Sequence, residues 1–102
     1  MKTFDKKAFE KGVKRIIETA KNSDYKNKEE ALSDIIEDYI EKSPKDLVYL
    51  ASLIDYLNDK GIDESKIDPR DVMVVDNFST LDFLAGKSIE MIYLYCLKKM
   101  MK

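Results

Sequence analysis

The 102-residue chain has 18 basic and 20 acidic side chains, a net charge of −2, no histidine, no tryptophan and a single cysteine. Its length is that of one ordinary domain, and an apolar fraction of 44% can form a core without disulfides or metals. The missing histidine removes the usual base of nucleophilic catalysis, and one cysteine is too few for a zinc site. We therefore expect one domain, residues 1–102, with no catalytic residue, no cofactor and no metal.

The charges are unevenly distributed along the sequence. Residues 1–28 carry a net charge of +5, residues 29–84 a net charge of −10 and residues 85–102 a net charge of +3. Such segments can attract one another within a fold, or they can form separate binding faces. The N-terminal residues lack the apolar stretch of a signal peptide, and one cysteine favours a reducing compartment, so we expect a cytoplasmic protein without a membrane anchor.

The first predicted helix extends from about Asp5 to Lys21. Its apolar residues recur at helical spacing, and lysines occupy the opposite side. The apolar stripe consists of Phe9, Val13, Ile16, Ile17 and Ala20. Gly12 lies within the pattern and weakens the helix by about 1 kcal/mol relative to alanine.

The second predicted helix, Lys28 to Lys42, has a core face on one side and an acidic face on the other. The core face consists of Leu32, Ile35, Ile36, Tyr39 and Ile40. The acidic face consists of Glu30, Asp34, Glu37, Asp38 and Glu41. Five carboxylates on one face could imitate a nucleic-acid backbone to a basic partner, although an ordinary solvated face has the same pattern.

The third predicted helix begins with Ser43 as the N-cap and Pro44 in the first turn, and it ends near Lys60. Gly61 then stands where a left-handed residue is favoured. The apolar face consists of Leu47, Leu50, Ala51, Ile54 and Leu57, beside a second stripe of Tyr49, Leu53 and Tyr56. Because only a narrow arc is polar, we expect this helix to pack between neighbours.

Residues 62–78 are ambiguous between a short strand and a helical turn, and we favour the turn because no second strand-like segment exists to pair with it. Five carboxylates cluster there, and a weak cation site or an active site is one possible interpretation of them: Asp63, Glu64, Asp68, Asp71 and Asp76. Their spacing does not match a calcium loop. Solvated loop acids are the simpler interpretation.

The last predicted helix extends from about Ser79, its expected N-cap, to Met101. It is apolar nearly all round, which indicates a central position in the bundle or a subunit contact. In its second half, Leu94, Leu97 and Met101 form an additional apolar side. A two-fold dimer through this side is one prediction, and coverage by the first helix within a monomer is the other.

These patterns predict an all-α bundle of four long helices plus one short helical turn. Its core should bring together Leu32, Ile35, Ile54, Leu57, Ile89 and Ile92. The predicted function is that of a non-catalytic protein-binding module, such as a small bacterial or phage regulator or inhibitor. It would sequester a larger, nucleic-acid-processing protein through the acidic face and two exposed tyrosines, Tyr49 and Tyr56. The alternative is a nucleic-acid-binding regulator that uses the basic first helix and the C-terminal lysines.

Overall fold

The computed structural model describes residues 4–43, 46–62 and 77–101, and within them it contains four α-helices and no β-strand. The helices are α1 (Lys6–Lys21), α2 (Lys28–Lys42), α3 (Leu47–Asp59) and α5 (Asn77–Met100). The predicted all-α bundle is confirmed. The predicted short helical turn falls mainly on residues 63–76, which lie outside the described residues.

Short polar side chains cap the first three helices. The carboxylates of Asp5 and Asp46 and the amide oxygen of Asn27 each accept a hydrogen bond from the backbone N–H two residues later, at 2.8–2.9 Å. Each cap satisfies a donor that has no partner inside its helix and stabilises the helix by about 1 kcal/mol. At the other end of α3, Gly61 has a φ of 72° and ends the helix in the left-handed region, as predicted.

Two predicted N-caps are wrong. Asp46 caps α3 in place of Ser43, whose hydroxyl instead donates a hydrogen bond of 2.8 Å to the carbonyl of Tyr39 at the end of α2. Serine can donate to a helix end as well as accept at a helix start, and Asp46 is the stronger acceptor close to the apolar stripe. The last helix begins at Asn77, so Ser79 lies inside its first turn and does not precede it.

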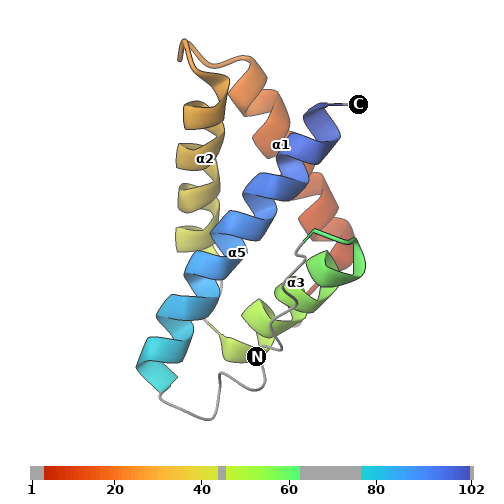
Figure 1. Cartoon of the computed structure of the whole chain (residues 1–102), viewed down its shortest axis with the longest axis vertical. Coiled ribbons are helices and arrows are strands. Elements are labelled where there is room, and N and C mark those ends of the chain that lie inside the picture. The colour runs from red at the N-terminus through yellow and green to blue at the C-terminus, as the bar shows by residue number, and fades with distance from the viewer. Residues whose placement is uncertain (1–3, 44–45, 63–76, 102) are drawn as a thin grey trace.

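The last helix is the centre of the bundle. It runs diagonally across the molecule and packs on α1, α2 and α3, as Figure 1 shows. This position explains why α5 is apolar on several sides, since each side meets a different neighbour. In the described part of the chain, α2 and α3 both pack on α5 but barely on each other.

The core forms where the apolar stripes of all four helices meet. Of the six residues predicted to be buried together, Leu32, Ile54, Leu57 and Ile92 are at most 1% exposed. Ile35 and Ile89 are only half-buried and lie at the edge of the core. Both belong to the correct apolar stripe, but each lies at its margin, where the neighbouring helix no longer covers it.

Gly12 has a packing role that its low helix propensity does not reveal. A Cβ atom at this position would lie 3.1 Å from the Cε2 atom of Tyr39 on α2. The absence of a side chain therefore lets the ring of Tyr39 pack directly against the backbone of α1.

Candidate functional site

A groove lined by acidic and apolar side chains follows the seam between α2 and α5. One part of it encloses about 340 Å³ and is lined by Glu37, Ile40, Glu41, Leu50, Leu81, Asp82, Ala85 and Ile89. The adjoining part is lined by Asn27, Glu29, Glu30, Ser33, Ile89, Glu90 and Tyr93. Ile89 lines both parts, so the two adjoin, and we refer to them together as the acidic groove.

The floor of the acidic groove is a row of half-buried apolar side chains on α5. Leu81, Ala85, Ile89 and Tyr93 follow one another at every fourth residue. Such a row stays on one side of a helix, and its twelve-residue span corresponds to about 18 Å. In the described part of the chain, α2 and α3 both pack on α5 but barely on each other, so no described helix covers the floor between them.

Carboxylates stand on both sides of this floor. Glu29, Glu30, Glu37 and Glu41 come from α2, while Asp82 and Glu90 come from α5, and all six side chains are exposed. Of these six carboxylates, only Glu90 has a described basic neighbour within ion-pair distance, with Lys87 Nζ at 3.9 Å. Five carboxylates thus lie beside apolar surface without an ion pair in the described part of the chain, and they create a negative potential along the groove.

The acidic face predicted for α2 divides between two surfaces. Glu30, Glu37 and Glu41 line the acidic groove. Asp34 accepts a hydrogen bond of 3.2 Å from the hydroxyl of Tyr25, and Asp38 forms an ion pair with Lys42 at 3.0 Å. The latter two carboxylates therefore belong to the neighbouring side of α2 and have partners within the chain.

The prediction that Tyr49 and Tyr56 are exposed is wrong, because both are half-buried and neither lines the acidic groove. Their rings lie 5.7 and 5.6 Å from the ring of Phe4, and Tyr56 also packs edge-on against Phe9 at 5.8 Å. The second stripe of α3 thus packs against the start of the chain, a contact between residues more than 40 positions apart.

The hydroxyl of Tyr56 belongs to a polar cluster that joins α1, α3 and α5. Glu10 Oε1 accepts hydrogen bonds from Tyr56 and Tyr95, both of 2.7 Å, and Lys99 Nζ lies 3.6 Å from Oε2. Burial on its own would raise the pKa of Glu10, but the two tyrosine hydroxyls and Lys99 more than offset this, so the pKa is lowered. Burial and the adjacent Glu10 carboxylate in turn raise the pKa of Tyr95. We refer to these four residues as the Glu10 cluster.

The other side chains that could in principle react or bind a metal are Cys96 and the remaining carboxylates. Cys96 is fully buried, and desolvation raises the pKa of its thiol to about 12, so it is a packed and unreactive thiol. No group of three or more Cys, Asp or Glu side chains in the described ranges is arranged to hold a metal ion. The loop carboxylates that left a cation site open, Asp63 to Asp76, fall outside those ranges.

The sequence predicts the α2 side of the groove but not its α5 side. Asp82, Ile89, Glu90 and Tyr93 come from α5, whose broad apolar character concealed a half-buried stripe. The signal was present in the spacing of 81, 85, 89 and 93, with acids at 82 and 90 that each follow a member of this row and lie on the same side of it. However, only the observed pairing of α5 with α2 shows that these residues face the acids of α2.

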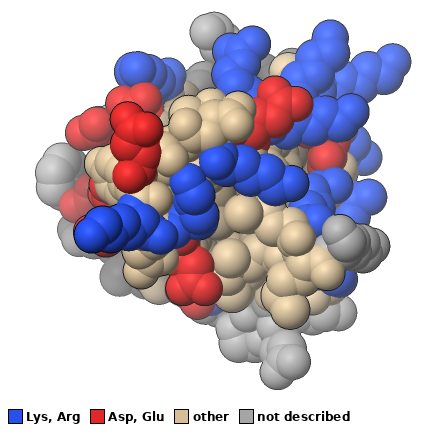
Figure 2. All heavy atoms as spheres, turned by 90° about the horizontal axis from the view of Figure 1, so that it is seen from above, with Lys and Arg blue, Asp and Glu red and all other residues tan. Residues whose placement is uncertain are grey.

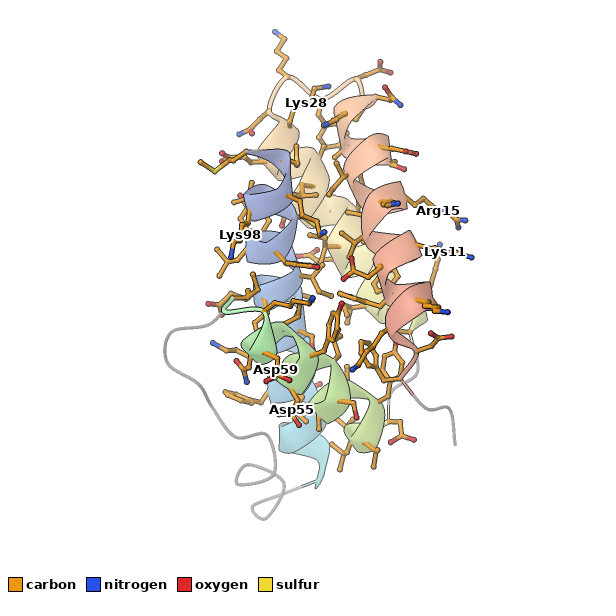
Figure 3. The ribbon with its side chains drawn as sticks, turned by 90° about the vertical axis from the view of Figure 1, so that its right-hand side faces the viewer. Lys11, Arg15, Lys28, Asp55, Asp59 and Lys98 are labelled. Atoms are coloured by element: carbon orange, nitrogen blue, oxygen red, sulfur yellow. The ribbon has the colours of Figure 1, made fainter. Side chains whose placement is uncertain are left out.

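The basic residues gather at the end of the molecule where α1 turns into α2, an end that the part of the acidic groove lined by Asn27, Glu29 and Glu30 also reaches. Figure 2 shows the end where the turn from α1 to α2 lies near the C-terminus of α5, and Lys and Arg cover much of this face, with acids between them. Lys21, Lys26, Lys28 and Lys98 are exposed there. In Figure 3, Lys11 and Arg15 point outward from α1, while Lys98 lies on the other side of the bundle, so the basic residues surround this end and do not form one stripe.

Two of the three residues predicted for self-association are exposed, and the third is not. Leu94 is 41% exposed and Met101 85% exposed, whereas Leu97 is half-buried against the core. This exposure follows from helix length, because α3 has 13 residues and α5 has 24, so α3 covers about 20 Å of a helix about 36 Å long.

The chain matches no known protein family, and comparisons with curated proteins and with solved structures found no match either. None of the described helices has the length and apolarity needed to cross a membrane. The groove and the charges around it are therefore the basis for assigning a function.

Proposed function

We propose that this chain is a non-catalytic protein-binding module that holds a basic partner in the acidic groove. The observation that carries the proposal is the set of five carboxylates that lie beside an apolar floor without an ion pair in the described part of the chain. Apolar surface provides affinity when it is covered, and complementary charge accelerates the encounter and selects the partner. A small bacterial or phage regulator that sequesters a nucleic-acid-processing protein would agree with this groove, since proteins that process nucleic acids present basic surfaces.

A small-molecule site agrees less well with the same groove. Its two parts, at about 340 and about 490 Å³, lie in the lower half of the range for ligand pockets. None of the described residues that line the two parts is basic, so no described cation there would bind a phosphate or a carboxylate. A cationic protein surface with apolar anchors matches the lining better than a metabolite does.

The test compares two variants that lose the same charge at different places. Glu37→Gln/Glu41→Gln neutralises the α2 side of the groove, and Asp55→Asn/Asp59→Asn neutralises the outer side of α3, where Figure 3 shows both residues. Each immobilised chain is exposed to an extract of the cells that encode it. We expect one stoichiometric protein to be retained by the unmodified chain and by the α3 variant, and lost from the groove variant. Equal retention by all three chains would refute the proposal.

Nucleic-acid binding is the second candidate, because the fold brings the C-terminal lysines of α5 to the same end as the basic turn between α1 and α2 (Figure 2). Lys11→Gln/Arg15→Gln removes two exposed cations from α1. If these residues contact phosphates, the slope of log K against log salt should fall by about 2 for a labelled duplex, measured by fluorescence anisotropy. An unchanged slope would remove α1 from this candidate function.

We further propose a two-fold dimer through the exposed end of α5, where Leu94 and Met101 lie. Apolar side chains at this end would be covered in an isologous contact, the commonest kind in homodimers. Sedimentation equilibrium of the chain and of Leu94→Glu/Met101→Glu decides the question. A mass near 11.9 kDa for both chains, independent of concentration, would refute the dimer.

A further inference from the structure

We infer that the partner occupies the acidic groove with a single amphipathic α-helix of about three to four turns, which has large aliphatic side chains along one stripe and Lys or Arg on both flanks. This inference rests on the proposed function and adds the conformation and chemistry of the bound element. It follows from the length of the groove, from the placement of charge on its two sides and from the open side of α5.

The length of the floor matches a short helix. The apolar row extends from Leu81 to Tyr93, about 18 Å, which is the length of a helix of about twelve residues. A helix of this length presents three or four large side chains on one stripe. The row on α5 contains four positions, so each turn of the bound helix would meet one of them.

The charges select a helix over an extended segment. Glu30, Glu37 and Glu41 line the α2 side of the groove, and Asp82 and Glu90 line the α5 side. An amphipathic helix has two flanks beside its apolar stripe, so basic residues on both flanks would reach both rows of carboxylates. Alternate side chains of a strand point to opposite faces, so its basic residues would point away from a floor that its apolar residues contact.

The packing of the bundle leaves room for such a helix. The helices α2 and α3 both contact α5 but barely each other, so the side of α5 between them has no helical neighbour in the described part of the chain. Ala85 is the smallest side chain in the floor, between Leu81 and Ile89, and it borders the part that encloses about 340 Å³. A large aliphatic anchor of the partner would enter beside Ala85, and this docking of an amphipathic helix into a groove is a recurring mode of recognition.

The experiment uses a labelled synthetic peptide of about 14 residues made of Leu, Lys and Ala, with leucines at i, i+3, i+4 and i+7 and lysines on both flanks. A second peptide is identical except that one central alanine is replaced by proline, which prevents a continuous helix. Binding is followed by fluorescence anisotropy at low and high salt, and peptide helicity by circular dichroism. We expect the uninterrupted peptide to bind more than about tenfold tighter and to gain helicity on binding.

Variants of the protein then locate the peptide. Ala85→Trp fills the groove and should weaken binding about tenfold or more, with Ala85→Leu as a milder variant if the first unfolds. Glu37→Gln/Glu41→Gln should weaken binding and flatten its salt dependence, whereas Asp55→Asn/Asp59→Asn should leave both unchanged. Equal binding of the two peptides, or no effect of either Ala85 substitution in a folded protein, would overturn the inference.

The outcomes separate this inference from the proposed function. If the cellular partner depends on Glu37 and Glu41 but the proline peptide binds as well as the helical one, the protein-binding function stands and the helix is wrong. If neither the partner nor the peptide depends on these carboxylates, both proposals fail. If the unmodified chain dimerises and Ala85→Trp abolishes the dimer, the occupant is a second copy of the chain and the inference of a separate basic helix is overturned.

Discussion

The Glu10 cluster and the acidic groove are two places where carboxylates meet apolar surface on α5, and they differ in what surrounds the charge. Glu10 accepts two tyrosine hydrogen bonds of 2.7 Å and lies beside Lys99. Glu37 and Glu41 also lie beside α5, but no described side chain bonds or pairs with them. The same chemical group is therefore part of the fold in one place and open to a partner in the other.

Two tyrosines on α5 show how close these regions are in sequence. Tyr93 lines the acidic groove, and Tyr95 donates to Glu10. Residues two positions apart on a helix point in nearly opposite directions, so α5 separates the two regions by its own geometry. Changes on one side should affect stability, and changes on the other side should affect binding.

The largest expected loss of stability comes from shortening a buried side chain in the core, and it serves as the reference for the groove floor. Ile54→Ala and Ile92→Ala each remove a fully buried side chain and should lower the free energy of unfolding by about 2–5 kcal/mol. Ile89→Ala on the groove floor should cost clearly less, because this side chain is only half-buried. Urea denaturation of the three variants measures the difference. A loss at Ile89 equal to that at Ile92 would show that the floor is core and not a binding surface.

Removing the charge of the Glu10 cluster should have the next largest effect. Glu10→Gln keeps the shape but loses the charge, and we expect a loss of about 1–2 kcal/mol at neutral pH. Because the folded pKa of Glu10 is lowered, its contribution is present above the unfolded pKa and is lost as the pH falls through the folded pKa.

The pH dependence of stability tests this assignment. The unmodified chain and Glu10→Gln are unfolded in urea at a series of pH values from neutral to acidic, with Glu37→Gln as the control. The difference between the first two should shrink as the pH falls through the carboxylate range, while the control should follow the unmodified chain. A difference that stays constant across this range would mean that Glu10 stabilises the fold only by packing.

Tyr93 and Tyr95 allow the same comparison within one turn of α5, with smaller expected changes in stability. Tyr95→Phe removes one donor to Glu10 and should cost about 1 kcal/mol, whereas Tyr93→Phe should change stability by less than about 0.5 kcal/mol. Thermal unfolding of both variants measures the two values under the same conditions. Equal losses would contradict the separation of α5 into a structural side and a binding side.

The helices could be predicted from the sequence because each has an apolar stripe of helical period next to a polar cap or a glycine. The second helix was predicted at its observed bounds, and Gly61 ends the third helix in the expected conformation. The caps at Ser43 and Ser79 were wrong because several residues in each stretch can cap. The choice among them depends on where tertiary contacts fix the first turn.

The acidic groove and the Glu10 cluster could be predicted only in part, because both join segments that are far apart in sequence. The acids of α2 were identified, but Asp82 and Glu90 are recognised only once α5 is placed beside α2. Tyr56 was interpreted as exposed because its partner Glu10 lies 46 positions away. A pattern of period 3.6 shows which side of a helix is polar, but it does not show which other helix that side faces.

The smallest expected effect on stability belongs to the groove, and its sign should be opposite to that of Glu10→Gln. Glu37 and Glu41 are like charges at i and i+4 on one helix, a pair that destabilises it by about 0.2–0.5 kcal/mol. Glu37→Gln/Glu41→Gln should therefore leave the fold equally stable or slightly more stable. Asp55→Asn/Asp59→Asn removes a second i, i+4 pair and, with Asp59 at the C-terminal end of α3, should stabilise by a similar or slightly larger amount.

Urea denaturation at low salt measures both variants, and binding of the basic helical peptide distinguishes them, since only the groove variant should lose it. A loss of more than about 1 kcal/mol in the groove variant would mean that these carboxylates, like Glu10, hold the fold together and are not free for a partner.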